Sequence, residues 1–346
     1  MNLEKRIAVF ASLGKAMRSR VEQRDDSYET LCRQAYLKNN WFTKESIDSA
    51  MMAWSNVLTG EQITGWLKEY HIPGTFTGKK IGVINAGNIP LVGLHDFIAV
   101  LVSGHYYLGK NASEDNLLLP YIASLLAETS PDFQNQFQFI DRLTQFDAVI
   151  ATGSNNSSRY FESYFSKVPH IIRKNRNGIA LLDGNESKED FEKLGTDIFQ
   201  YFGLGCRNVS KLYVPQEYNF NSFFEAMYSF SEIMQHNKYM NNFDYNNAML
   251  LMKQIPFLQN GFLIIREEER ISSPISVVHY EKYSDIEQLA EILDKAEEQV
   301  QCVITKRELN LKSLLKDRVV DFGKAQFPAL NDYADGVDTI EFLNTL

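Results

Sequence analysis

Four loops carry the residue types and spacing that could support chemistry, and one of them holds a cysteine. That loop, YFGLGCRNV (201–209), places Cys206 between glycines and a basic residue, Arg207. A thiolate is a strong nucleophile, and a neighbouring cation favours that form of the side chain. Cysteines outside disulfides are also commonly buried and inert. Two interpretations of Cys206 therefore stay open on these residues alone: a nucleophile, or a small apolar filler.

The other three loops have features of ligand-binding turns. They are NAGNIPL (85–91), GKNASED (109–115) and ATGSNNS (151–157). Glycines before a helix permit phosphate binding at the helix start, and a strand-end lysine can hold a phosphate or ribose. The alternatives are a plain tight turn, helix capping by Ser154 or Asn155, and a solvated Lys110, which is the commoner state of such a lysine. The sequence has neither the GxGxxG dinucleotide fingerprint nor a GxSxG serine elbow.

The elements around these loops alternate between strand and helix patterns. Residues 1–74 read as a helical N-terminal segment, and a linker rich in Gly, Pro and Thr occupies 71–80. Strands and helices then alternate over 75–175 and again over 176–325, followed by a tail, 326–346. Ser113 is expected to cap the helix that follows it, and Ser187 with Asp190 to open another. This alternation predicts an α/β fold with parallel sheets covered on both faces, the candidate loops lying at strand ends.

Composition narrows the class of protein. The chain has 346 residues and a formal net charge of −9, which argues against nucleic acid or an anionic membrane as the main partner. Its three cysteines are far apart and lack metal-site spacing, which fits a reducing compartment. Cys32 and Cys302 fall in core-like patterns, and His95 and His105 are expected to be structural. We therefore expect no metal, no membrane span and a cytoplasmic location.

Taken in order, the four loops resemble the aldehyde dehydrogenase superfamily, and within it the LuxC-type acyl-CoA reductase family. The resemblance runs from about residue 75 to the C-terminus. It implies two α/β lobes, one cofactor-binding and one catalytic, with the helical segment packing on the former. It makes Cys206 the nucleophile and Asn88, in AGNIP, an oxyanion-hole donor. It assigns cofactor binding to the following positions: Lys110, Ser113, Gly153 and Ser154.

Departures from the family pattern shape the expected reaction. The glutamate that activates the deacylating water in aldehyde-oxidising members falls near Ile172, where IRKNRNG has no carboxylate. Without that base an acyl-cysteine should hydrolyse slowly. Ser113 stands in place of the acidic ribose partner, which favours NADPH, while the adjacent Glu114 keeps NADH as the alternative. The glutamate that holds the nicotinamide ribose falls near Arg270, beside Glu269, and neither residue is assigned that role.

The resemblance therefore implies an oxidoreductase of fatty acid metabolism. It would reduce an acyl-CoA or other acyl thioester to the aldehyde with NADPH, through an acyl-Cys206 intermediate. One alternative is an NAD-dependent aldehyde dehydrogenase. Another is a non-catalytic subunit of an acyl-transfer complex, since family chains can associate with acyl-activating partner proteins. We also expect a homo-oligomer, to which the segment 332–346 could contribute.

Overall fold

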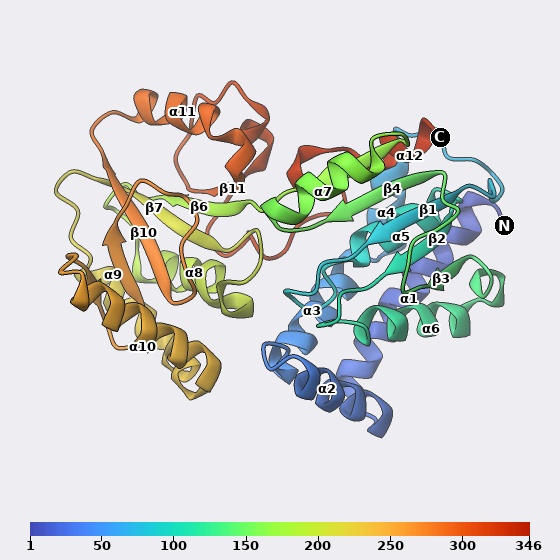
Figure 1. Cartoon of the computed structure of the whole chain (residues 1–346), viewed down its shortest axis with the longest axis horizontal. Coiled ribbons are helices and arrows are strands. Elements are labelled where there is room, and N and C mark those ends of the chain that lie inside the picture. The colour runs from blue at the N-terminus through green and yellow to red at the C-terminus, as the bar shows by residue number, and fades with distance from the viewer. The chain divides into compact units, whose positions relative to one another are not determined.

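Two α/β units make up the chain in the computed structural model, which describes residues 1–346 apart from the side chain of Asn155. Unit 1 comprises Met1–Lys174 and Ala329–Leu346, and unit 2 comprises Asn175–Pro328. Each unit is built on its own sheet (Figure 1). The N-terminal residues, the first α/β set and the last eighteen residues of the chain therefore share one unit.

Four helices open unit 1, and side-chain caps begin each of them. They are α1 (Leu3–Gln23), α2 (Asp26–Lys38), α3 (Lys44–Val57) and α4 (Gly60–Leu67). The capping side chains of Asn2, Asp25, Thr43 and Thr59 each accept a hydrogen bond from a backbone N–H in the first turn. α1 buries Phe10, Leu13 and Met17 completely. These contacts make the first four helices part of the core of unit 1.

A five-stranded parallel sheet follows, with the strand order β3-β2-β1-β4-β5. Its strands are β1 (Lys80–Ile84), β2 (Tyr106–Lys110), β3 (Phe137–Phe139), β4 (Ala148–Thr152) and β5 (His170–Arg173). Its helices are α5 (Leu94–Val102), α6 (Leu118–Thr129) and α7 (Asn155–Phe165). The chain moves outward from β1 to β3 and then returns to the other side of β1. The order of the strands thus reverses between β1 and β4, which is where open α/β sheets bind ligands.

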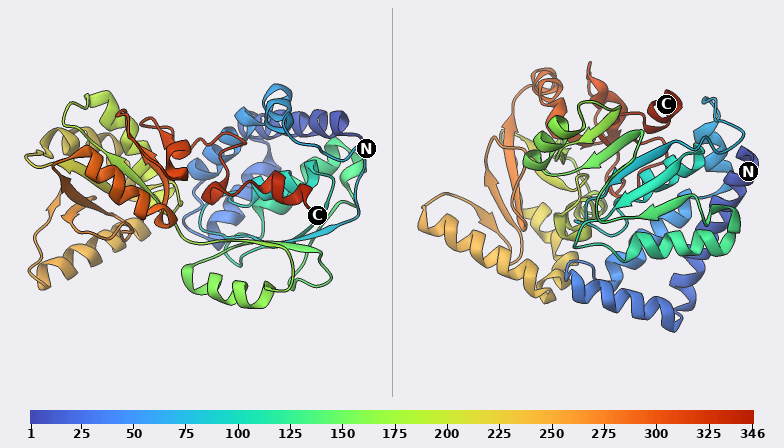
Figure 2. Two further views of the ribbon diagram at one scale, coloured as in Figure 1. Left: turned by 90° about the horizontal axis from the view of Figure 1, so that it is seen from above. Right: turned by 45° about the vertical axis from the view of Figure 1, so that its right-hand side comes forward.

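Alternate residues of these strands fill two apolar layers. Phe161 and Phe165 of α7 pack on one face against Val149 and Ala151, and Phe97 of α5 packs on the other against Tyr107. The ring centroids of Phe97 and Tyr107 are 4.9 Å apart. Figure 2 shows α7 on one side of the sheet and the N-terminal helices on the other. Both faces are covered, which is why the strands are apolar runs.

The C-terminal segment, including α12 (Thr339–Asn344), packs onto unit 1. Trp66 Nε1 donates to Tyr333 Oη at 2.7 Å. His105 Nε2 lies 3.0 Å from the Leu343 carbonyl oxygen. Arg173 forms a buried ion pair with Asp96 at 2.5 Å and donates to Thr339 Oγ1 at 3.0 Å. Polar contacts from well-separated parts of the sequence therefore hold the tail within this unit.

Unit 2 contains a seven-stranded sheet with the order β12-β11-β6-β7-β10-β9-β8. Its strands are β6 (Asn177–Leu181), β7 (Val209–Pro215), β8 (Leu258–Gln259), β9 (Ile264–Glu267), β10 (Val277–Tyr283), β11 (Val300–Ile304) and β12 (Val319–Val320). Its helices are α8 (Lys188–Phe199), α9 (Asn221–Met227), α10 (Asn237–Met252) and α11 (Ile286–Lys295). β8 runs antiparallel to β9, whereas the other pairs are parallel. In Figure 1, α11 covers one face of the sheet and α8 the opposite face.

The structure confirms the α/β alternation and changes several details. The capping box of Ser187 and Asp190 forms as predicted. The prediction that Ser113 caps the next helix is wrong: α6 begins at Leu118, and Asp115 Oδ1 accepts a hydrogen bond from the Leu118 N–H at 3.2 Å. The segment 221–235 forms a short helix, α9, followed by a 3₁₀ helix, Tyr228–Gln235. The strand β5 and the helix α10 were not predicted.

Candidate functional site

The carboxyl ends of β1, β2 and β4 bring together the residues predicted in unit 1. Lys110 is the last residue of β2 and is in register with Ile84 at the end of β1. Asn88 follows β1, and Gly153 follows β4 on its other side. The side chains of Asn88 and Lys110 are exposed. Residues that are far apart in the sequence thus share the edge where the strand order reverses.

Asn85, directly after β1, ties two of these loops together. Its side-chain amide donates to Tyr107 Oη and to Asn111 Oδ1, both at 2.8 Å. At Gly87, a methyl group would lie 2.8 Å from the Cβ of Ala112, closer than carbon atoms normally approach. The loops after β1 and β2 are therefore packed against each other. Asn85 was not among the predicted site residues, although a polar residue directly after a buried strand is the signal that could have found it.

The turn after β4, where phosphate binding is predicted, caps a helix. Ser154 Oγ accepts a hydrogen bond from the Ser157 N–H at 3.2 Å and so begins α7. A methyl group at Gly153 would lie 2.9 Å from both Phe161 and Ser157. The backbone at residue 153 can therefore lie close to α7 only because it has no side chain. The alternative cap, Asn155, falls outside the described side chains.

Ser113 lies in an exposed turn beside an ionised carboxylate. Its Oγ donates to Glu114 Oε2 at 2.8 Å, and this hydrogen bond lowers the pKa of Glu114. The loop that follows Lys110 therefore carries negative charge at neutral pH. Asp115 is buried, which raises its pKa to about 6. Position 113 carries a serine, and a carboxylate, Glu114, stands next to it.

In unit 2, Cys206 lies on a loop with an unusual backbone. Three consecutive residues, Tyr201, Phe202 and Gly203, have left-handed φ values of 52°, 59° and 77°. That conformation costs about 1–2 kcal/mol for a residue other than glycine. The turn stacks Phe202 on His236 with ring centroids 4.2 Å apart. The chain is thus reversed sharply between α8 and β7, just before Cys206.

Asn208 holds this reversed loop from within. Its buried side-chain amide lies within hydrogen-bonding distance of three backbone carbonyl oxygens: Gln200 at 2.8 Å, Asp197 at 3.0 Å and Ile198 at 3.3 Å. Its Oδ1 accepts from the Gly205 N–H at 2.8 Å. These bonds satisfy carbonyls that the end of α8 leaves without helical partners. Asn208 therefore fixes the backbone on both sides of the turn that carries Cys206.

Cys206 differs from the other two cysteines in exposure. Cys32 and Cys302 are 3% and 0% exposed, and burial raises their pKa values to about 11 and about 12. Cys206 is half-exposed. The positive charge of Arg207 opposes the effect of burial on the pKa of Cys302. The expectation that Cys32 and Cys302 belong to the core is confirmed, and Cys206 is the thiol that a reagent can reach.

Two histidines of unit 1, His95 and His105, have structural contacts. His95 Nε2 lies 2.8 Å from the Leu330 carbonyl oxygen, and His105 Nδ1 lies 2.8 Å from Thr77 Oγ1. Among the described residues, no three His, Cys, Asp or Glu side chains are grouped so that they could hold a metal ion.

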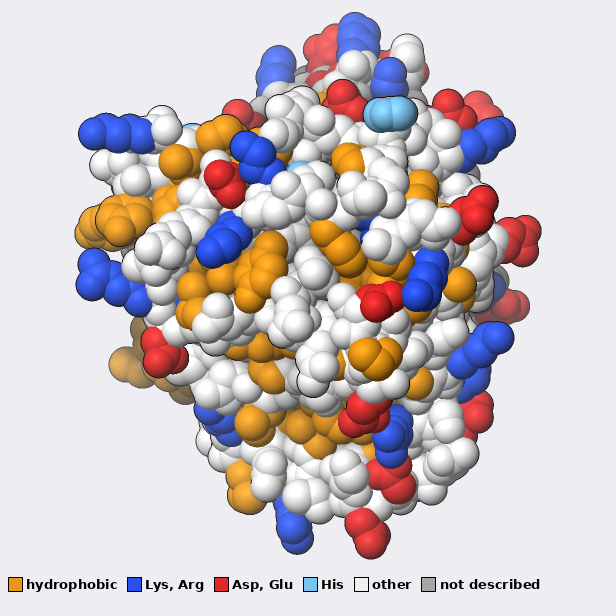
Figure 3. All heavy atoms as spheres, turned by 90° about the vertical axis from the view of Figure 1, so that its right-hand side faces the viewer, with side chains coloured by type: hydrophobic (Ala, Val, Ile, Leu, Met, Phe, Trp, Pro, Cys, Tyr) orange, Lys and Arg blue, Asp and Glu red, His pale blue; other side chains and the backbone are white. Residues whose placement is uncertain are grey.

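None of the helices in the described chain combines the length and apolar character needed to cross a membrane. Figure 3 shows a face with acidic and basic groups interspersed.

Comparisons with known proteins bear on the fold. The sequence matches no protein-family model and no curated protein. The structure aligns with AldA, an indole-3-acetaldehyde dehydrogenase of P. syringae solved as a mutant with NAD+ and IAA. This match covers 93% of the chain and 76% of AldA, with 14% identity and a TM-score of 0.66. Aldehyde dehydrogenase 21 of Physcomitrella patens, solved with the reaction product succinate, matches over 100% and 84%, with 13% identity and a TM-score of 0.67.

A third match is the NAD-dependent benzaldehyde dehydrogenase of Corynebacterium glutamicum. It covers 93% of this chain and 81% of the other, with 12% identity and a TM-score of 0.66. Likeness at such low identity concerns the fold. The chain has an aldehyde-dehydrogenase-like fold with two predominantly parallel α/β sheets.

Proposed function

We propose that this chain is an oxidoreductase of the aldehyde dehydrogenase type that works through Cys206. The observation that carries the proposal is the Cys206 loop: a reachable thiol on a strained turn that Asn208 holds at four backbone positions. Strained, tightly fixed turns are concentrated at functional sites. The solved structures with this fold bear aldehyde dehydrogenase names, which supports the same class of chemistry.

The unit 1 edge fits a nicotinamide cofactor. At Gly87 and Gly153 the backbone has no Cβ, and a Cβ there would come too close to neighbouring side chains. The N-terminal end of α7, which carries a partial positive charge, begins at Ser154. In this proposal Lys110, Ser113, Gly153 and Ser154 hold the cofactor, which supplies a hydride. Because a serine, Ser113, stands in place of the acidic ribose partner, no carboxylate at that position repels the 2′-phosphate of NADPH. The ionised carboxylate of Glu114, in contrast, favours NADH, whose ribose has no such phosphate. Comparing kcat/KM for the two cofactors decides between them.

The reaction we favour is reduction of an acyl thioester. The Cys206 thiolate adds to the thioester carbonyl, the bond to the leaving sulfur breaks, and that thiolate takes up a proton. Hydride then adds to the acyl carbon, and the bond to Sγ breaks to release the aldehyde and restore the thiolate. The Cys206 backbone N–H and, by the resemblance, Asn88 are the expected oxyanion donors. The absence of a carboxylate near Ile172 supports this direction, because an acyl-enzyme without a base survives attack by water.

Aldehyde oxidation with NAD is the second candidate. It is favoured by the solved neighbours, whose names describe aldehyde dehydrogenases and, in one case, NAD dependence. This reaction requires a base that activates water to attack acyl-Cys206, and the segment 172–178 contains no carboxylate for that role. Steady acid formation from an aldehyde, with no coenzyme A present, would establish this candidate and exclude the first.

The test uses cysteine variants and both reaction directions. Cys206→Ala should reduce turnover of acyl-CoA to aldehyde by at least about 1000-fold while leaving cofactor binding within about twofold, because the thiol forms the covalent bond. Cys32→Ala is the matched control: it removes a buried thiol of unit 1 and should retain turnover. Retention of wild-type turnover by Cys206→Ala, in either direction, would eliminate Cys206 as the nucleophile.

A further inference from the structure

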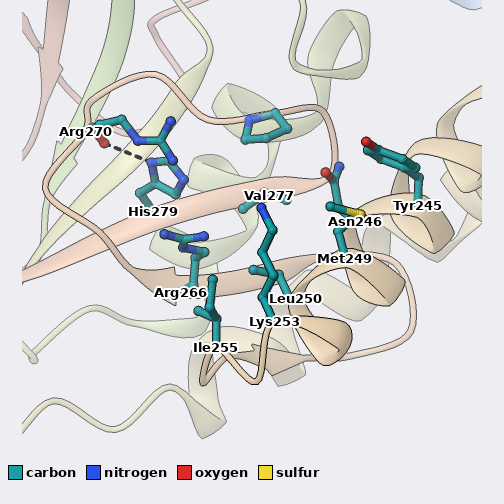
Figure 4. A pocket seen from close by; sticks show the side chains of 11 residues that line it. Tyr245, Asn246, Met249, Leu250, Lys253, Ile255, Arg266, Arg270, Val277 and His279 are labelled. Atoms are coloured by element: carbon teal, nitrogen blue, oxygen red, sulfur yellow. Dashed lines mark hydrogen bonds between the residues drawn. The ribbon is translucent and has the colours of Figure 1, made fainter.

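A cavity of 210 Å³ in unit 2 lies between α10 and the strands β9 and β10. Part of its wall is apolar and comes from Met249, Leu250, Ile255 and Val277. Figure 4 shows the rest: Arg266, Arg270 and His279 group on one side, and Tyr245 and Asn246 of α10 stand on the other. The mixture of apolar wall and clustered basic groups is typical of a site for an organic anion.

The charges around this cavity sum to a positive value. Lys253, Arg266 and Arg270 line it, and one carboxylate, Glu268, forms ion pairs with both arginines. The hydrogen bond from Arg270 is the largest influence on Glu268, and its pKa falls to about 2, so this group is ionised at neutral pH. Three cations and one anion leave an excess of about two positive charges, with Lys253 and Arg270 exposed to solvent and Arg266 mostly covered.

Arg266 has hydrogen-bonding capacity that the described residues do not use. Its side chain is 15% exposed, and Glu268 accepts from one terminal nitrogen. Its Nε is buried and has no hydrogen-bond partner among the described residues. A buried guanidinium donor left without a partner is costly, and a planar guanidinium presents paired donors that match an oxyanion. A ligand oxygen that reached this wall would satisfy the unused donor.

His279 fixes the position of the exposed arginine. Its buried ring Nδ1 lies 2.8 Å from the Arg270 carbonyl oxygen, and burial lowers its pKa, so the ring is neutral and can donate there. The charged groups facing His279 are Arg266 and Arg270 on the cavity side and Glu268 beside them. The imidazole thus holds the backbone of the loop rather than adding charge.

We propose that this cavity binds the phosphate of a phosphate ester whose organic part lies on the apolar wall. A phosphate monoester carries about −1.5 to −2 charge at neutral pH, which matches the excess of positive charge, and a carboxylate would balance only half of it. Lys253 and Arg270 face the phosphate from the solvent side, and the Arg266 Nε–H donates from the buried side. The ligand class is a phosphorylated thioester donor of the coenzyme A type, an assignment that rests on the proposed function.

The cavity is connected to the Cys206 loop through β7. Ser210 Oγ donates to the Ile271 carbonyl oxygen at 2.7 Å, and Lys211 Nζ donates to the Glu269 carbonyl oxygen at 2.6 Å. The backbone on either side of Arg270 is therefore bonded to the first residues of the strand that Cys206 precedes. β7 and β10 are adjacent, with Lys211 in register with His279. β7 therefore connects the backbone beside the cavity to the loop that carries the thiol.

Calorimetric titration of the full chain with coenzyme A, 3′-dephospho-coenzyme A and pantetheine tests the proposal. Wild type should bind coenzyme A at least about tenfold more tightly than pantetheine, which has no phosphate. Arg266→Gln and Lys253→Gln should each weaken coenzyme A binding about tenfold and leave pantetheine binding unchanged. Lys295→Gln, on the exposed side of α11, is the matched control and should bind like wild type. Because Lys253 is exposed, its variant keeps the test valid if Arg266→Gln fails to fold.

Each outcome is decisive. Weaker binding of the 3′-dephospho form assigns the cavity to the 3′-phosphate, and unchanged binding assigns it to the phosphates nearer the pantetheine arm. Equal affinity for coenzyme A and pantetheine, or wild-type affinity in both variants, would overturn the proposal. If the chain binds coenzyme A through Arg266 but does not reduce acyl-CoA, the phosphate site stands and the proposed function fails. If the chain reduces acyl-CoA and neither substitution affects that reaction, the proposed function stands and the phosphate site fails.

Discussion

Replacing Asn208 with alanine should loosen the Cys206 loop and cost the chain about 3 kcal/mol of stability. The side-chain NH₂ of Asn208 donates to three backbone carbonyl oxygens, and its Oδ1 accepts from one backbone N–H. Each hydrogen bond contributes about 1 kcal/mol net, and a buried group left without a partner costs about 1–3 kcal/mol. The left-handed residues Tyr201 and Phe202 together store about 2–4 kcal/mol of strain. Without the amide bonds that hold these strained residues in place, the loop should relax locally before the unit unfolds.

Two measurements separate local relaxation from general damage. Calorimetric melting of Asn208→Ala should fall by about 6–12 °C, since 1 kcal/mol corresponds to about 2–4 °C for a unit of this size. Alkylation of Cys206 by a neutral reagent should become several-fold faster as the loop opens, while turnover drops by about 100-fold or more. Turnover should fall further than stability explains, because a misplaced nucleophile loses its alignment with the substrate.

Two further variants sharpen the test. Asn208→Asp keeps an acceptor for the Gly205 N–H but directs a carboxylate at three carbonyl oxygens, so it should be less stable than Asn208→Ala. Asn242→Ala is the matched control: its amide bonds one carbonyl on the exposed side of α10, and its removal should change melting by less than about 2 °C. If Asn208→Ala melts and is alkylated like wild type, the loop is not held by this residue and our account of it is wrong.

Two more predictions concern a buried acid and a glycine. Burial raises the Asp197 pKa to about 7, so its folded form binds a proton more tightly than the unfolded chain, near 3.9. Its contribution to stability is complete below about pH 4 and is lost as pH rises toward 7, by on the order of 4 kcal/mol. In urea unfolding, the free energy of unfolding of Asp197→Asn should therefore rise relative to that of wild type as the pH increases from about 4 to about 7. A difference between the two proteins that does not change with pH would refute the pKa shift. Gly153→Ala should destabilise by about 1–3 kcal/mol because its methyl meets Phe161, whereas Gly60→Ala, with open space around it, should not; equal melting would contradict this.

The sequence could predict the elements whose signals are local. The apolar runs and strand–helix alternation predicted both sheets, and the Ser187 and Asp190 spacing predicted a helix start that forms. α10 was missed because its asparagine-rich sequence is a poor helix former with an irregular apolar pattern. It is stabilised by tertiary burial of Phe243 and Leu250 against β9 and β10. Local propensity could not reveal contacts that form only after the sheet does.

The candidate site shows the same division. Motif order was enough to choose Asn88, Lys110 and Cys206, and the structure places the first two at neighbouring strand ends. Asn208 gave no signal, because three carbonyls converge on its amide only after the chain has reversed at Tyr201. The cationic cavity gave no signal in the sequence either, because Lys253 and Arg270 line the same cavity only after α10 has packed on β10. Whether the selected residues perform the chemistry stays a prediction.

The first residues of β7 link the features that we propose to be functional. Asn208 holds the loop before the strand, while Ser210 and Lys211 hold the backbone around Arg270. Lys211 is fully buried and pairs with Glu281 at 2.5 Å, an arrangement that costs desolvation and adds little stability compared with an apolar pair. An aliphatic residue would fill the same space at lower cost but could not bond the Glu269 carbonyl. The buried lysine is therefore better explained as a positioning residue, which sets the cationic loop relative to the strand that Cys206 precedes.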